Sequence, residues 1–548
     1  MTKKNNPFRT IRDNGNEIQN HVIDEFLSGR LSRRELLRAG SMLGLWTLGG
    51  SGLIASFSSQ AASPVARTIR IGHPMPSGAI DPITAFDVAS PALLNQSGEY
   101  LVNSDSVAAT LRPALALSWM PNSKGDVWTF RLRKGVRFQN GQPLTAKDVA
   151  ATFDRLTDPA AGSAAKATFR GVLSKGGTQA RDENTVEFHL DAPNGSFPWY
   201  VSSDTINAVI LPFDFKGAYE QSFPGTGPYR LERFQPRVGV TFVRNDNYWG
   251  AKAKTERLEF KFYGDQQGQI LAMQGREVDL LTRFTVHGGL ALLNSPEFRV
   301  AGTRSSTHRQ VHMRTDQGVF KDKRVRQALA LSLDREAMVR GLLMGRGVPA
   351  NDHPFAPVFP IFDPSVPQKS KDLEGAKARL AAAGVGNGFS ATLTTEAFLE
   401  MPDLAVVVQN AAKSIGANIS LRVESQEAYY GSGTPGKSDW LDSQMGMTDY
   451  GHRGVPDSFL RGPLMSGGAW NAAHFANTQY DQLVARYTAT LDVREQKEIA
   501  GKIERLLTDE VPVAIPYFAD SLIVTRANLE GVRFSAMAQL YLDQAVLS

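Results

Sequence analysis

Residues 127–149 read VWTFRLRKGVRFQNGQPLTAKDV and combine three local signals in one short stretch. The large apolar side chains of Trp128–Leu132 stand at every second position, so they share one face of a predicted strand. The Asn-Gly pair at 140–141 is typical of a turn. The Thr-Ala-Lys-Asp run at 145–148 resembles a capping box and predicts a helix that continues to about residue 156.

Strand-like and helix-like segments alternate along the rest of the chain, which predicts a mixed α/β class. Further strands are predicted at 68–72, 185–190, 240–243 and 258–262. Helices are predicted at 321–332, from Asp334 to about Gly345, and from Asp492 onward, and Pro/Gly-rich loops at 349–369 and 431–438. A chain of 548 residues predicts three or four domains. Because no low-complexity linker separates them, we expect domains formed by chain that crosses between them more than once.

The composition excludes several classes of protein and of site. The chain is 42% hydrophobic and 21% charged, which is ordinary for a globular protein. It contains no cysteine, which excludes disulfides, thiolate metal sites, iron–sulfur clusters, a cysteine nucleophile and a cysteine-linked lipid anchor. The net charge of +5 is too small and too evenly spread to indicate a nucleic-acid partner.

The first 66 residues are typical of an export signal. Paired arginines stand in Ser32–Leu37, an apolar run follows at Ala39–Phe57, and Ser59–Ala66 is rich in small residues that suit a signal peptidase. This order predicts a secretory signal, and the paired arginines favour the twin-arginine route. An uncleaved membrane anchor is the alternative, although five glycines interrupt the apolar run. Cleavage would leave 67–548 free in the periplasm with a net charge of +2, because the leader holds eight basic and five acidic residues.

Two formal matches to catalytic motifs lack the context that the chemistry requires. Residues 431–438 fit G-x-x-x-x-G-K-[ST], but no buried strand precedes them, and Pro435 removes one N–H from a phosphate cradle. Ser163–Lys166 fits S-x-x-K, a pattern expected by chance, and no K-T-G element accompanies it. The sequence contains neither H-E-x-x-H nor G-x-S-x-G. These observations favour a binding protein or an enzyme of unrecognised type.

The nine histidines form no metal motif in the sequence. His308 and His312 are four residues apart, but the pattern around them is extended rather than helical. His73, His452 and His474 could meet in a cleft, although most such histidines are solvated or structural. We expect neither a metal site nor a cofactor.

A set of segments resembles one protein family in the order in which the segments occur. They are Leu115–Trp119, Trp128–Phe138, Gly141–Val149, Gly225–Tyr229, Asn245–Trp249, Gly275–Asp279, Phe320–Leu329 and Val511–Tyr517. In these segments the sequence resembles the large solute-binding proteins of ABC importers, the family of periplasmic oligopeptide-, dipeptide- and nickel-binding proteins. The resemblance covers essentially all of 67–548.

The resemblance implies a periplasmic-binding-protein-like α/β fold, in which two lobes surround a cleft and close on the ligand. The implied domains are 1–66 as the signal, 67–307 plus 518–548 as the first lobe with an extra subdomain at 100–210, and 308–517 as the second lobe. Two hinge crossings would lie near Arg304–His312 and Pro516–Phe518. A chain that crosses twice through packed strands needs no flexible linker.

The resemblance also implies a ligand site. Peptide-binding members hold an extended ligand through main-chain hydrogen bonds, as an added strand would be held, and a buried aspartate pairs with the amino terminus of the peptide. Asp449 stands at the position of that aspartate, and a role as a turn or cap residue is the alternative. The candidate ligand-binding residues are Asp449, Tyr450, Met447, Thr448, Ala85, Phe86, Arg309, His474 and Trp470.

Two departures from the family pattern bear on the ligand. Dipeptide binders hold the ligand carboxylate with an arginine upstream of the aspartate, whereas the corresponding loop here has only Lys437 as a cation. The first hinge region, Thr307–His312, is more basic than in oligopeptide binders, so the residues that face the cleft would favour an acidic group on the ligand. Alternation along a strand puts one set of side chains inside and one outside, and the sequence leaves open which set contains Arg309. The segment Gly451–Val455 is a second basic element near the expected amine site.

We therefore expect a non-enzymatic, monomeric, periplasmic substrate-binding subunit that captures a peptide or peptide-like amine and delivers it to an ABC permease in the inner membrane. The same fold could instead bind an opine-like conjugate, a chelated metal or an oligosaccharide, the last by stacking on Trp440 and Trp470. The alternatives from other classes are an exported hydrolase and a subunit that hands its ligand to a membrane sensor.

Overall fold

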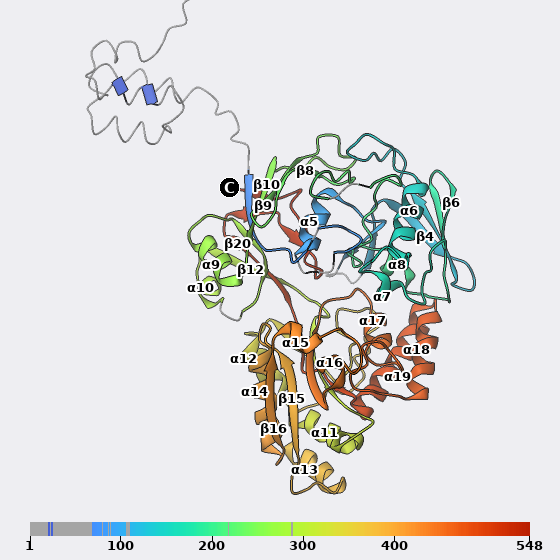
Figure 1. Ribbon diagram of the computed structural model, residues 1–548, viewed down its shortest axis with the longest axis vertical. Coiled ribbons are helices and arrows are strands. Elements are labelled where there is room, and N and C mark those ends of the chain that lie inside the picture. Colours follow the sequence, from blue (N-terminus) through green and yellow to red (C-terminus); the bar gives the residue numbers. More distant parts are fainter. Residues whose placement is uncertain are drawn as a thin grey trace, which may run out of the picture. The chain divides into compact units, whose positions relative to one another are not determined.

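Two large β-sheets organise the chain from residue 68 onward (Figure 1). The computed structural model describes residues 20–21, 24–25, 68–78, 80–85, 87, 89–105, 110–216, 219–286 and 289–548. The expected twin-arginine segment and cleavage region lie outside these residues. Arg67–Ser548 form one compact unit.

The first sheet is mixed and is built from strands that lie far apart in the sequence. Within the described residues its order is β12 (Phe298–Thr303), β20 (Ser521–Arg526), β11 (Leu280–Phe284), β1 (Thr68–Pro74), β10 (Arg257–Tyr263), β9 (Gly239–Arg244) and β8 (Tyr229–Gln235). β1 runs parallel to β10 and β11, and the other pairs are antiparallel. The strands predicted at 68–72, 240–243 and 258–262 are confirmed.

The second sheet is also mixed. In the described part of the chain its order is β14 (Gly347–Pro349), β19 (Tyr517–Ala519), β13 (His308–Met313), β17 (Met445–Tyr450), β15 (Ser390–Glu396) and β16 (Asn418–Glu424), with β18 (Val513–Ala514) paired to β13. β15 runs parallel to β16 and β17. Every residue of β13 is buried, and the extended pattern predicted around His308 and His312 is confirmed. The two mixed sheets with their helices confirm the predicted α/β class.

The stretch at 127–149 forms part of a four-stranded antiparallel sheet beside the first sheet. The order is β4 (Ala116–Pro121), β5 (Val127–Leu132), β7 (Thr185–His189) and β6 (Thr178–Asp182). Trp128, Phe130 and Leu132 are buried together as predicted. The helix α6 (Ala146–Thr157) begins at the predicted capping box, where the carboxylate of Asp148 accepts the backbone N–H of Thr145 at 2.7 Å.

A close approach of two backbone segments explains the glycines of the Gly225–Tyr229 run. A Cβ atom on Gly225 would lie 1.8 Å from the carbonyl oxygen of Ser97, and one on Gly227 would lie 2.8 Å from that of Gln96. The N–H of Gly227 donates to the Ser97 carbonyl at 2.9 Å. Only residues without a side chain allow this contact, which ties the run to the end of α5 (Ser90–Ser97).

The chain passes between the two large sheets twice, from β12 to β13 and from β19 to β20. The two crossings are hydrogen-bonded to each other, because Ser305 Oγ donates to the Ala519 carbonyl at 2.7 Å and the Ala519 N–H donates to Thr307 at 2.8 Å. Arg304 Nη1 also lies 2.9 Å from Asp520 Oδ1. The two crossings are thus short and packed, as expected for a chain without linkers.

Helices flank both sheets (Figure 1). Those not yet named are α7 (Lys166–Phe169), α8 (Phe197–Tyr200), α9 (Gln266–Gln274), α10 (Leu290–Leu293), α11 (Lys323–Ser332), α12 (Arg335–Leu342), α13 (Leu373–Ala382), α14 (Met401–Ser414), α15 (Gln426–Tyr430), α16 (Asp439–Asp442), α17 (Asp457–Arg461), α18 (Thr478–Ala489) and α19 (Val493–Glu510). The predicted helices correspond to α11, α12 and α19, and in each case the preceding aspartate (Asp322, Asp334 or Asp492) accepts a backbone N–H of the first turn. In the described part of the chain, no helix is long and apolar enough to cross a membrane.

The 431–438 loop has a structure that leaves no phosphate cradle. The short helix α15 precedes it where a nucleotide site requires a buried strand. The carboxylate of Asp442 accepts the N–H groups of Gly436 at 2.8 Å and Ser438 at 3.1 Å. These donors are therefore already occupied.

Candidate functional site

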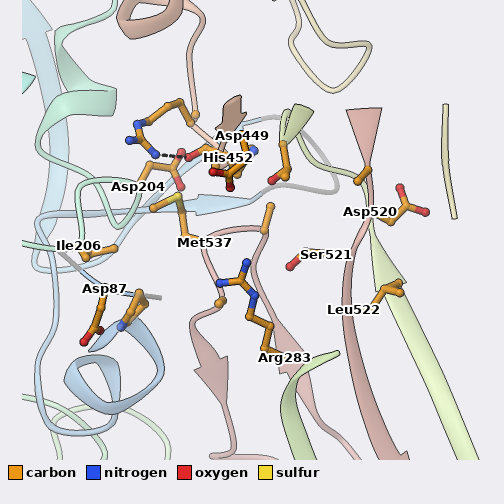
Figure 2. A pocket seen from close by; sticks show the side chains of 18 of the residues that line it. Asp87, Asp204, Ile206, Arg283, Asp449, His452, Asp520, Ser521, Leu522 and Met537 are labelled. Carbon is orange, nitrogen blue, oxygen red and sulfur yellow. Dashed lines mark hydrogen bonds between the residues drawn. The ribbon is translucent and has the colours of Figure 1, made fainter. Parts of the chain in front are cut away.

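A cavity of about 460 Å³ lies where elements of the first and second sheets face each other. Residues from the first-sheet side include Ala85, Asp87, Asp204, Arg283 and Ser521, and residues from the second-sheet side include Arg309, Glu400, Asp449 and the 451–455 segment. Figure 2 shows Asp449 and His452 on one side of this space, with Arg283 reaching toward them from the other side. Both sheets therefore contribute charged groups to one site.

Neighbouring strands place Arg309 on β13 opposite Asp449 on β17. The Arg309 side chain is only 4% exposed, and its Nε and Nη2 atoms each lie 2.9 Å from Glu400 Oε1. Its Nη1 atom is 3.9 Å from Asp449 Oδ2, which is too far for a hydrogen bond. The hydroxyl of Tyr517 donates to the same Glu400 oxygen at 3.1 Å. Glu400 thus holds the guanidinium, and the carboxylate of Asp449, 24% exposed, is left facing the cavity.

The electrostatics of this pair follow from burial and mutual attraction. Burial alone would lower the pKa of Arg309, but the nearby carboxylates of Glu400 and Asp449 raise it overall. Burial alone would raise the pKa of Glu400, but the Arg309 guanidinium lowers it below its ordinary value. Both groups therefore stay ionised and paired.

A second buried carboxylate, Glu396 at the end of β15, lies beside Asp449. Burial raises the pKa of Glu396, and the negative charge of Asp449 raises it further. The hydroxyl of Tyr430 donates to Glu396 Oε1 at 2.7 Å and lies 2.8 Å from the hydroxyl of Thr448. Two carboxylates that repel each other in a buried site gain stability from a bound cation. An ammonium group is a suitable occupant, because it makes strong charge-assisted hydrogen bonds to carboxylates.

The 451–455 segment meets the first-sheet side at Asp204. Burial raises the pKa of this carboxyl to about 7, although Ser104 and Arg453 act in the opposite direction. A Cβ atom on Gly454 would lie 1.8 Å from Asp204 Oδ2, so the contact requires glycine. His452 accepts the N–H of Ser306 at 3.0 Å through Nδ1, and burial lowers its pKa to about 3. The imidazole is therefore a neutral structural acceptor in this segment.

Comparison with known proteins identifies the family. Residues 110–471, well over half of the chain, match the model described as "Bacterial extracellular solute-binding proteins, family 5 Middle". The chain belongs to this family. This solute-binding protein is 23% identical to heme-binding protein A of Haemophilus influenzae over 470 residues, which cover 77% of this chain and 83% of that protein. It is 24% identical to the dipeptide-binding protein DppE of Bacillus subtilis over 455 residues, 77% of this chain and 81% of that protein.

A solved structure supports the fold. The ABC transporter-associated periplasmic binding protein DppA from Helicobacter pylori, in complex with the peptide STSA, matches with a TM-score of 0.70 at 20% identity. The match covers 88% of this solute-binding protein and 98% of that chain. The predicted two-lobed, periplasmic-binding-protein-like fold is thereby confirmed.

The structure brings only some of the predicted ligand residues of this solute-binding protein to the cavity. Asp449, Arg309 and Ala85 line it. Phe86 lies outside the described residues. In the hinge region Thr307 and Arg309 line the cavity, whereas His308 packs against the rings of Tyr450, Phe459 and Phe518.

Five predicted ligand residues do not line this cavity: Met447, Thr448, Tyr450, Trp470 and His474. Met447 and Tyr450 are buried in apolar clusters on the two faces of β17, and Thr448 is hydrogen-bonded to Tyr430. Trp470 packs over Gly462, and His474 lies 3.5 Å from Asp316. Their side chains are used in packing and in local hydrogen bonds, and that of Thr448 joins the site around Asp449 only through Tyr430, which also binds Glu396.

The residues named as alternatives for other ligands do not converge either. His73 bonds to Thr282 and to the Ala89 carbonyl, away from His452 and His474. Among the described residues, no group of three or more His, Asp or Glu side chains is arranged to hold a metal ion. Trp440, like Trp470, is not part of the cavity lining, so neither tryptophan offers a stacking platform for a sugar there.

Sequence reasoning missed several charged residues of the site, among them Asp204, Arg283 and Glu400. Arg283 carried the clearest signal, because it is a lone cation within the apolar strand Leu280–Phe284. Charged residues are seldom placed in buried strands without a partner or a function. Glu400 and Asp204 lie at helix and loop ends, where acidic residues are common, so the sequence carried no signal for them.

Proposed function

We propose that this protein is the substrate-binding subunit of an ABC importer and captures a peptide or peptide-like amine. The observation that carries the proposal is the carboxylate of Asp449, which faces the cavity beside Glu396 while Arg309 is held by Glu400. The ligand ammonium would bind Asp449 and relieve the repulsion between the two carboxylates. The protein performs no chemistry on its ligand, and its function rests on the difference in affinity between open and closed states.

We propose that closure moves two lobes against each other about the paired crossings. The first lobe comprises 67–307 plus 518–548, with the extra subdomain at 100–210, and the second comprises 308–517. Each lobe contains one of the two large sheets, and the cavity is lined from both. Closure around the ligand would exclude water and strengthen the ion pair at Asp449.

We also propose a place of action. The leader at 1–66 would direct export by the twin-arginine route, and cleavage would release a monomer into the periplasm. Its partner would be the ABC permease in the inner membrane, which receives the closed, loaded form. Two similar proteins, a dipeptide-binding protein and a periplasmic binding protein in complex with a peptide, support this function.

A panel of ligands tests the proposal through thermal stabilisation. Free-amine tripeptides should raise the melting temperature of the wild-type protein, because a ligand that binds only the folded state stabilises it. N-acetylated tripeptides, haem, nickel–histidine and oligosaccharides should not. The variant Asp449→Asn should lose the response, whereas Asp214→Asn, at an exposed position, should keep it. Equal stabilisation by free and acetylated tripeptides, or stabilisation by haem, nickel–histidine or a sugar alone, would contradict the amine site.

A further inference from the structure

Arg283 enters the cavity from the first sheet at a local irregularity of its strand. The pairing of β11 with β20 shifts register between Leu281 and Phe284, and Arg283 lies within this interval. A β-bulge turns a side chain away from the regular alternation, and bulges often occur next to binding sites. Figure 2 shows the Arg283 side chain directed into the cavity, with Asp449 and His452 beyond its guanidinium. The backbone geometry thus presents a cation to the ligand space.

The Arg283 guanidinium has no partner among the described residues: no hydrogen bond and no ion pair within 4 Å engages it. The other two guanidinium groups discussed above are engaged, Arg309 by Glu400 and Arg453 by the His452 carbonyl at 2.8 Å. Arg283 is half-buried at the edge of the cavity, and an arginine carries five N–H donors. These donors are therefore left for a ligand.

The charges around Arg283 do not compensate for its burial. Burial lowers the pKa of Arg283, Arg309 lowers it further by repulsion, and the carboxylates of Asp449 and Glu400 offset this only in part. Both carboxylates already interact with Arg309, at 3.9 Å and 2.9 Å. A ligand carboxylate next to Arg283 would supply the close attraction that these two carboxylates do not give it.

A hydroxyl group lies at the same part of the cavity. Ser521 begins β20, the strand that pairs with β11, and lines the cavity. Figure 2 shows the Ser521 oxygen at about the height of the Arg283 guanidinium and to its right in this view. A planar guanidinium together with a hydroxyl donor is a suitable set for a carboxylate, which accepts two parallel N–H bonds and a further O–H bond.

We propose that Arg283, with Ser521, forms a carboxylate subsite, so that the ligand is zwitterionic. This inference rests on the proposed function, because the ligand ammonium is assigned to Asp449. Asp449 belongs to the second sheet and Arg283 to the first, so a ligand with both charges joins the two sides of the cavity. The carboxylate is either the C-terminal group of a short peptide or an acidic side chain, since both present the same two oxygens.

A tripeptide library in four chemical forms tests the subsite. The forms are the free peptide, the N-acetyl acid, the C-terminal amide and the doubly capped peptide, each enriched on the full-length protein and quantified by mass spectrometry. In the wild type, amidation should reduce enrichment about tenfold or more, because it removes a charge-assisted bond. If the carboxylate is instead a side chain, peptides with Asp or Glu should be enriched over those with Asn or Gln, and amidation should have little effect.

Variants assign the effect to Arg283. In Arg283→Gln the preference for the carboxylate should fall below about threefold, while the cost of N-acetylation stays as in the wild type. Arg283→Lys should restore only part of the preference, because an ammonium cannot form the two parallel bonds. Arg230→Gln, an exposed arginine on β8, is the matched control and should behave as the wild type. Ser521→Ala provides a second variant that leaves the guanidinium in place and should reduce the preference several-fold.

The outcomes separate the two proposals. A carboxylate preference that is as large in Arg283→Gln as in the wild type would overturn the subsite, as would a wild type with no preference for a carboxylate at either position. An intact carboxylate preference with no cost for N-acetylation would support the subsite and contradict the amine site at Asp449. If Asp449→Asn lost both the amine and the carboxylate preference and no other variant did, the carboxylate effect would belong to Asp449. This outcome would also count against Arg283.

Discussion

Arg309→Met is predicted to destabilise the protein strongly, because it removes the cation that compensates the buried carboxylate of Glu400 and the partly exposed carboxylate of Asp449. The Arg309 and Glu400 side chains are 4% and 6% exposed, and their atoms approach to 2.9 Å. In the variant, Glu400 would keep the hydroxyl of Tyr517, at 3.1 Å, but no longer the guanidinium, and Asp449 would lose the cation at 3.9 Å. Methionine has a similar length, so the effect comes from charge rather than from a cavity.

The expected loss is about 3–5 kcal/mol in the free energy of unfolding, the cost of removing one partner from a buried ion pair. Equilibrium urea unfolding followed by far-UV circular dichroism measures it. The double variant Arg309→Met, Glu400→Gln serves as the control, because it removes both charges. Its stability should recover to within about 1 kcal/mol of the wild type, since a buried pair contributes little once both charges are replaced.

The opposite pattern would refute the reasoning. A loss of less than about 1 kcal/mol in Arg309→Met would show that Glu400 is neutral or solvated in the folded protein. A double variant less stable than either single variant would show that the two side chains act through packing and not as a pair.

Two further predictions concern the fold and its dependence on pH. Gly225→Ala should lower the free energy of unfolding in urea by about 3 kcal/mol or more, because its Cβ would lie 1.8 Å from the Ser97 carbonyl oxygen. The control Gly264→Ala, which has open space around the Cβ, should change stability by less than about 1 kcal/mol. Equal effects of the two substitutions would contradict the close contact at Gly225. Burial raises the pKa of Asp204 to about 7. The folded state therefore binds more protons than the unfolded chain between about pH 4 and pH 7. The contribution of Asp204 to stability falls as the pH rises through that range. Asp204→Asn should therefore gain about 1 kcal/mol or more relative to the wild type between pH 5 and pH 8, and a constant difference between the two proteins would contradict the raised pKa.

Much of the fold could be predicted from the sequence, because its signals are local. The alternation at Trp128–Leu132, the capping box at Thr145 and Asp148, and the aspartates before α11, α12 and α19 are each decided by residues a few positions apart. Strand register and sheet order depend on packing between distant segments. The parallel pairing of β1 with both β10 and β11 therefore had to come from the structure.

The site was predictable only in part, for the same reason. Asp449 and Arg309 line the cavity, but the sequence could not say which face of β13 is inward, so the roles of Arg309 and His308 stayed open until the register was known. Trp470 and His474 follow Asp449 closely in the chain, yet their side chains pack elsewhere. Arg283 was missed because its direction depends on a bulge in a strand pair whose members are more than 200 residues apart.

The molecule that co-purifies with the protein tests the central claim most directly. Mass spectrometry of the extract from denatured protein should identify a short peptide or peptide-like compound that carries a free amine and a carboxylate. The same compound should be recovered unchanged after prolonged incubation with the protein. Recovery of haem, a metal chelate or a sugar without an amine, or conversion of the compound to a product, would contradict the account.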